Sequence, residues 1–232
     1  MKIVMIMLFS LVLALFAYIG YKKGVFKQLI SFVLFVLMTI TAYKLRVFPA
    51  SLCIKYLPFF NFGGAYNKVY SLNILIYQII SFIVILVLIY CIIYIIIGLT
   101  GISEYLTKKQ LSFDLISKLF GLLFGLFEGF IVSFVISVCL LQFPMTQSLI
   151  MNNKVLKGMV EKTPIVSRVF SSTIVSSQEF YFVSQDKAMS PEEKNLEMIR
   201  KLIRYEIVSA RTVQINIDNG KLRLDNVTVS SS

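Results

Sequence analysis

Residues 116–143 read ISKLFGLLFGLFEGFIVSFVISVCLLQF and carry a small residue at every fourth position of an apolar segment whose charges are Lys118 and Glu128. A helix places residues four apart on one inclined ridge. Small side chains on such a ridge let another helix approach closely in lipid, where the hydrophobic effect does not draw helices together. The pattern therefore predicts a membrane-spanning packing helix. Its ridge residues are Ser117, Gly121, Gly125, Gly129, Ser133 and Ser137.

Hydropathy extends this prediction to most of the chain. The 232 residues are 57% hydrophobic, against about 45–50% for a soluble domain, and the mean hydropathy is +0.81. A span needs roughly 20 apolar residues, and lipid offers no partners for backbone amides, so each span must be a helix. We predict an all-α polytopic membrane protein with a membrane domain at 1–143. Its four spans are residues 3–20, 25–43, 74–98 and 118–143.

The remaining chain has two parts, an amphipathic juxtamembrane segment at 144–183 and a C-terminal segment at 184–232. Ser190 precedes Pro191, and Glu193 stands three residues after that serine. A serine cap, a proline at the first helical position and a glutamate three residues after the cap form a helix start signal. We expect an amphipathic helix from Pro191 to about position 208.

The pattern at 212–229 has two interpretations. Val213, Ile215 and Ile217 alternate with polar residues, and Asp218-Asn219-Gly220 is a turn signal, which favours a β-hairpin. The alternative is a short helix that ends at Gly220 as its left-handed C-terminal residue. We take the hairpin as the first prediction.

Residue types exclude much enzyme chemistry. Histidine is absent, and Cys53, Cys91 and Cys139 have no paired spacing. Imidazole bases, Ser–His or Cys–His nucleophile pairs and most metal sites are therefore removed. No glycine-rich phosphate loop of the usual spacing is found. We expect a non-enzymatic protein with no cofactor and no metal.

Glu128 is the acidic residue that lies well inside a predicted span. An ionisable residue near the bilayer midplane is by default a candidate functional site, which here means cation binding, proton relay or pairing with a basic partner. If the span begins later, near Leu122, Glu128 instead lies close to a hydrated face. Gln78, within the third span, is expected to hydrogen-bond between helices.

Charge gives the orientation. The formal net charge is +11, which suits anionic lipid headgroups, whereas the tail has no dense basic tract for nucleic acid. The first loop is short and carries Lys22, Lys23 and Lys27, with Gly20 and Gly24 as candidates for a tight turn or a close helix contact. Lysines in short loops favour the cytoplasm. We therefore expect the first and third loops inside and both termini outside.

Two stretches together resemble a known family. They are GYKKGVFKQLIS at residues 20–31, directly after the first span, and LFGLLFGLFEG at 119–129, which opens the fourth. In this order and with four spans, the chain is similar to the colicin V production (CvpA) family of bacterial inner-membrane proteins over roughly residues 3–175. It departs from the family's frequent acidic residue early in span one, and Glu128 stands where a basic residue is common.

The resemblance implies a multi-pass protein of the bacterial cytoplasmic membrane, linked to toxin production or export and to envelope homeostasis. Some similar proteins carry an extracytoplasmic protease domain after four spans, which agrees with termini outside. We expect an accessory or scaffold protein that self-associates through helices or binds another membrane protein. The alternative is a small oligomeric channel or transporter that uses Glu128.

Overall fold

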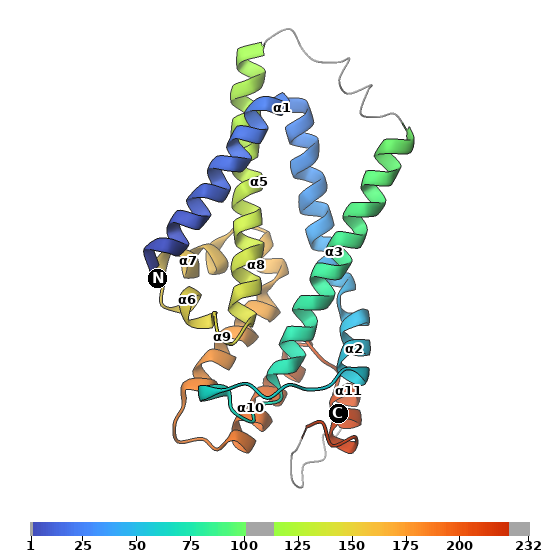
Figure 1. Cartoon of the computed structure of the whole chain (residues 1–232), viewed down its shortest axis with the longest axis vertical. Coiled ribbons are helices and arrows are strands. Elements are labelled where there is room, and N and C mark those ends of the chain that lie inside the picture. Colours follow the sequence, from blue (N-terminus) through green and yellow to red (C-terminus); the bar gives the residue numbers. More distant parts are fainter. Residues whose placement is uncertain (1, 101–113, 223–232) are drawn as a thin grey trace. The chain divides into compact units, whose positions relative to one another are not determined.

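The computed structural model describes residues 2–100 and 114–222, and every regular element in these ranges is helical (Figure 1). The all-α prediction is confirmed for this part of the chain. The chain divides into two compact units. The first consists of Met1–Ala42 and Val84–Ser137, and the second of Tyr43–Ile83 and Val138–Ser232.

Three helices among the described residues are long and apolar enough to cross a membrane. They are α1 (Lys2–Leu45), α3 (Leu72–Thr100) and α5 (Asp114–Gln142). The third and fourth predicted spans lie in α3 and α5. The first two predicted spans both lie in α1, so the structure has three long apolar helices in place of four separate ones.

The cause is the turn inside α1. Gly24 has φ 73° and ψ 172°, which is not helical, and the helix continues on both sides of it. Figure 1 shows α1 folding back on itself near its middle. Glycine adopts this left-handed φ without the steric cost of a Cβ. α1 therefore consists of a first limb before Gly24 and a second limb after it, each holding one predicted span.

The second unit holds the ends of the long helices and all the shorter elements. Its α3 portion is buried from Leu72 to Ile79. The shorter elements are α2 (Val47–Tyr56), the 3₁₀ turn η1 (Gly64–Tyr66), α6 (Gln147–Met151), α7 (Lys154–Lys162), α8 (Val166–Val169), α9 (Ser171–Gln185), α10 (Pro191–Arg204) and α11 (Ala210–Asp218).

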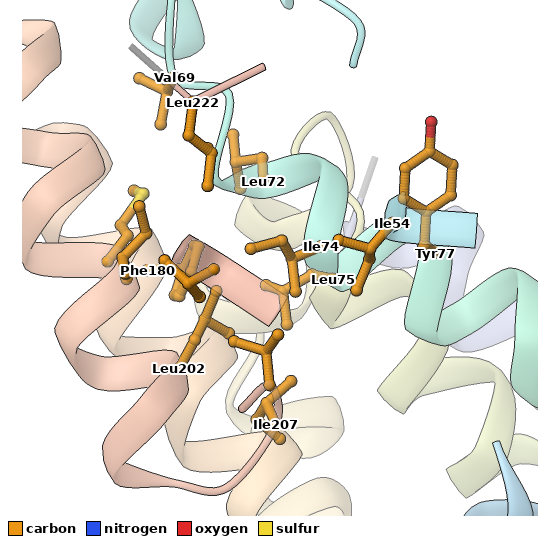
Figure 2. Close-up of a cluster of buried hydrophobic side chains, with 14 residues drawn as sticks. Ile54, Val69, Leu72, Ile74, Leu75, Tyr77, Phe180, Leu202, Ile207 and Leu222 are labelled. Atoms are coloured by element: carbon orange, nitrogen blue, oxygen red, sulfur yellow. The ribbon is translucent and has the colours of Figure 1, made fainter. Parts of the chain in front are cut away.

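A hydrophobic cluster joins the C-terminal helices of the second unit to the start of α3. Leu72 and Leu75 of α3 meet Phe180 of α9 and Leu202 of α10 in one buried core, to which α2 adds Ile54 (Figure 2). Burying a large apolar side chain contributes about 1.5–3 kcal/mol. The residues after α9 are therefore part of a folded unit built from two stretches of the chain.

A buried asparagine strengthens this junction. The Asn195 side chain on α10 accepts a hydrogen bond from the Ser71 backbone N–H (2.9 Å) and donates one to the Lys68 carbonyl (2.8 Å). Lys68 has a positive φ of 60°. Both backbone groups lie just before α3, so this amide fixes the loop that leads into the helix.

The predicted start of α10 is confirmed. The Ser190 hydroxyl accepts from the Glu193 N–H (3.2 Å), the Glu193 carboxylate accepts from the Ser190 N–H (2.7 Å), and Pro191 is the first helical residue. The hydrogen bonds from Ser190 hold the pKa of Glu193 below its ordinary value. The helix ends at Arg204, earlier than the position near 208 that the sequence predicts.

The hairpin prediction is wrong for residues 210–218, which form α11. Ser209 caps this helix by accepting from the Thr212 N–H (3.2 Å). Val213 and Ile217 are four residues apart, so a helix places both on one face, and both belong to or pack against the cluster of Figure 2. Residues 223–229 of the predicted hairpin lie outside the described residues.

The end of α11 follows the alternative interpretation. Gly220 has φ 68°, its N–H donates to the Ile217 carbonyl (2.9 Å), and the Lys221 N–H donates to the Asn216 carbonyl (2.9 Å). This pair of bonds is the Schellman arrangement that ends helices at a left-handed glycine. The turn signal at Gly220 was therefore a helix terminator.

A small ion cluster links α9 and α10. The Glu179 carboxylate lies 2.9 Å from the Lys201 ammonium and accepts a hydrogen bond from the Tyr205 hydroxyl (2.8 Å). Partial burial opposes ionisation of Glu179, but these partners outweigh it and hold its pKa below the ordinary value. The stabilisation is present above the ordinary glutamate pKa and is lost as pH falls through the lowered value. Both side chains keep some exposure to solvent, 17% for Lys201 and 30% for Glu179, and screening there limits the contribution.

Candidate functional site

The predicted ridge of small residues contacts the first limb of α1 through backbone atoms. A Cβ placed on Gly20 would overlap the Gly121 carbonyl oxygen and lie 3.0 Å from the Gly125 Cα. A Cβ on Gly121 would overlap the Gly20 carbonyl oxygen and lie 3.0 Å from the Gly24 Cα. Two helix backbones thus touch where both residues lack a side chain.

The contact continues along α5. A Cβ on Gly125 would overlap the Phe16 carbonyl oxygen, and one on Gly129 would lie 3.3 Å from the Leu13 Cα. All five glycines of this contact, counting Gly20 and Gly24, are buried. The three ridge glycines therefore pack against a limb of the same chain.

The ridge serines behave in two ways. Ser117 accepts a hydrogen bond from the Val25 N–H (3.2 Å), which is the first amide after the Gly24 turn. Ser133 and Ser137 are buried and donate to carbonyls four residues earlier in α5, those of Gly129 (2.8 Å) and Ser133 (2.9 Å). Ser117 thus helps to begin the second limb, whereas the other two satisfy their hydroxyls within their own helix.

Glu128 faces the second limb of α1. Its carboxylate accepts a hydrogen bond from the Gln28 side-chain amide (2.5 Å) and another from the Ser31 hydroxyl (3.2 Å). Glu128 is 6% exposed and Gln28 is 0% exposed. Ring contacts between Phe32 and Phe124 support the same limb, with centroids 6.3 Å apart. α5 therefore packs against both limbs of α1.

This polar cluster leaves one buried group without a partner. The side-chain oxygen of Gln28 (Oε1) has no hydrogen-bond partner among the described residues. Glu128 is held by neutral donors and makes no ion pair within the described ranges, while the positive charge of Lys23 acts on it from a longer distance. Burying a carboxylate without a paired cation is expensive, so a proton or a small cation would be stabilised here. An amide, a hydroxyl and a carboxylate are polar groups that can hold such a ligand.

The predicted turn lysines lie around Gly24. Lys22 and Lys23 are exposed and Lys27 is half-buried. The Lys22 ammonium lies 4.7 Å from the centroid of the Tyr18 ring. The turn therefore presents positive charge directly beside the glycine contact.

Sequence reasoning missed a buried arginine in the second unit, because Arg46 reads as a loop cation. Arg46 is 5% exposed, and its guanidinium donates to the Gln78 side-chain oxygen (3.0 Å), the Thr173 hydroxyl (2.8 Å) and the Tyr43 carbonyl (2.6 Å). Burial lowers its pKa, although an arginine stays charged. It ties the end of α1 to α3 and α9.

The signal for this network was Gln78, a polar residue in the most apolar helix. Its amide donates to the Ile207 carbonyl (2.8 Å) while its oxygen accepts from Arg46. The expectation that Gln78 bonds between elements is confirmed. Arg46 could not be recognised as its partner from the sequence, because a cation near a span boundary usually faces water.

Long apolar helices that pack through backbone contacts define a multi-pass membrane protein. The sequence matches the colicin V production protein family over residues 7–164. That match covers most of the chain, so the protein belongs to this family, as the motifs at 20–31 and 119–129 indicate. Comparison with curated proteins and with solved structures finds no match.

The glycine contact generates a direct prediction. Gly125→Leu forces a side chain into the Phe16 backbone and should lower the stability of the purified protein in detergent by about 1–3 kcal/mol or more. Gly98→Leu is the matched control, because a Cβ there meets nothing within 4 Å. The measurement is the apparent melting temperature. Equal melting of the two variants would contradict the contact.

Proposed function

We propose that the protein is a non-enzymatic accessory or scaffold protein of the bacterial cytoplasmic membrane that acts in toxin production or export and in envelope homeostasis. Family membership over residues 7–164 is the observation that carries this proposal. The second unit supports it, because two stretches of chain combine there into one folded unit with a hydrophobic core.

The proposed topology has four crossings, which are the two limbs of α1, then α3 and α5. Each limb holds about 20 residues and is about 30 Å long, which matches the hydrocarbon core. The lysines at the Gly24 turn favour the cytoplasm for that turn. The end of α1, the start of α3 and the end of α5 all enter the second unit. This arrangement supports an even number of crossings, with the second unit and both termini outside.

The expected partners are anionic lipid and another membrane helix. The ridge glycines already contact α1, so any helix association uses another surface. We favour the second half of α3, where the exposed Tyr90 and Tyr94 rings lie 6.4 Å apart and stack. Tyrosines are common at membrane interfaces and at helix contacts because one end is apolar and the other polar.

A complementation experiment tests the accessory role. In a toxin-exporting strain that lacks its own family member, the wild-type chain should restore toxin release. Glu128→Gln should restore it as well, since glutamine keeps the size and hydrogen bonding, whereas Gly125→Leu should fail. Loss of release in a stable Glu128→Gln variant would contradict a purely structural role for this residue.

A small oligomeric channel or transporter is the second candidate, and the buried cluster of Glu128, Gln28 and Ser31 favours it. The chain would then conduct protons or small cations when reconstituted in liposomes. Glu128→Gln should abolish most of that flux, and Glu161→Gln, at an exposed position on α7, should leave it unchanged. Flux that is equal in all three proteins would remove this candidate.

A further inference from the structure

The segment at residues 143–169 directly follows α5 and leaves several large apolar side chains exposed. Met145 is 76% exposed, Val155 64% and Ile165 72%, and Phe143 is 40% exposed. Single exposed apolar residues are ordinary on soluble surfaces. Here they occur in the stretch that directly follows a membrane-type helix along the chain, after α5 ends at Gln142.

The exposure of these residues is not caused by poor packing of the segment. The same stretch buries Ile150, Leu156, Val160 and Val166 inside the second unit. Asn153 caps α7 by accepting from the Val155 N–H (3.0 Å). The short helices therefore have a formed core, and the exposed apolar side chains are a separate outer set.

Ile165 is held outward by an unfavourable backbone conformation. Its φ is 65° and its ψ is −60°, and the Val166 N–H donates to the Pro164 carbonyl across it (2.7 Å). This is the strained form of the γ-turn, and a β-branched residue rarely adopts positive φ. Such strain clusters at functional positions, where surrounding structure maintains it.

The segment is also basic. It contains Lys154, Lys157, Lys162 and Arg168 against a single acid, Glu161, which gives a net charge of +3. Apolar side chains interspersed with lysine and arginine are typical of segments that lie in the interface of an anionic bilayer. The charge thus complements acidic lipid headgroups.

Chain continuity places this segment near a bilayer surface. The apolar part of α5 runs over 28 residues, about 42 Å at about 1.5 Å per residue, which exceeds the hydrocarbon thickness of about 30 Å. We propose that residues 143–169 lie in the headgroup region of an anionic bilayer, with Met145, Val155 and Ile165 inserted toward the acyl chains. This inference rests on the proposed crossing of the bilayer by α5, and it specifies which residues would bind the anionic lipid expected as a partner.

The chain contains no tryptophan, so the fluorescence of a single introduced tryptophan is measured without a contribution from other tryptophans. The variants are Ile165→Trp, Met145→Trp and, as control, Lys187→Trp at an exposed position between α9 and α10. Each full-length protein is reconstituted into vesicles that contain lipids brominated high on the acyl chain. We expect a several-fold larger fluorescence loss at positions 165 and 145 than at 187, and a larger loss in phosphatidylglycerol than in phosphatidylcholine vesicles.

The quenching results test bilayer insertion and the preference for anionic lipid separately. Quenching at 165 and 145 that is no greater than at 187 overturns it. Equal quenching in anionic and zwitterionic vesicles overturns the assignment to anionic lipid. Replacing Lys154 and Lys162 by glutamine in the Ile165→Trp chain should reduce the quenching in anionic vesicles alone. If Ile165→Trp does not fold, Met145→Trp carries the same test.

Discussion

The first unit depends on the backbone contact between α5 and the first limb of α1. Gly20 and Gly121 approach so closely that a Cβ on either would overlap the other's carbonyl oxygen. Lipid provides no hydrophobic pull between helices, so such close packing must supply the attraction itself. The same contact sets Ser117 beside the amide that follows Gly24. It therefore fixes both the turn of α1 and the position of α5 against the second limb, where Glu128 meets Gln28.

The second unit is organised by a different constraint, the burial of polar groups within an apolar core. Arg46 and Gln78 share one hydrogen bond, and Asn195 pairs with backbone groups before α3. A buried polar group left unpaired costs more than a paired one gains, so these bonds specify a single arrangement. These bonds give the second unit the single, defined surface that the proposed accessory role requires.

Much of this could be predicted from the sequence. Spacing identified the ridge from Ser117 to Ser137 and the α10 cap at Ser190, because both depend on local geometry. The ridge's partner could not be predicted, since Gly20 lies about a hundred residues away in the chain. Arg46 was missed because burial depends on tertiary packing. The pattern at 213–217 misled because residues that alternate also include a pair four apart, which a helix buries equally well.

We propose that Gly24 folds α1 into two crossings, with the turn inside and the second unit outside. The most direct measurement is labelling of single cysteines by an impermeant maleimide, in a chain whose three native cysteines are replaced. We predict that a cysteine at Lys187 labels in spheroplasts and that one at Lys22 labels only after lysis. Labelling of both positions from the same side, or no labelling of Lys22 under either condition, would contradict it.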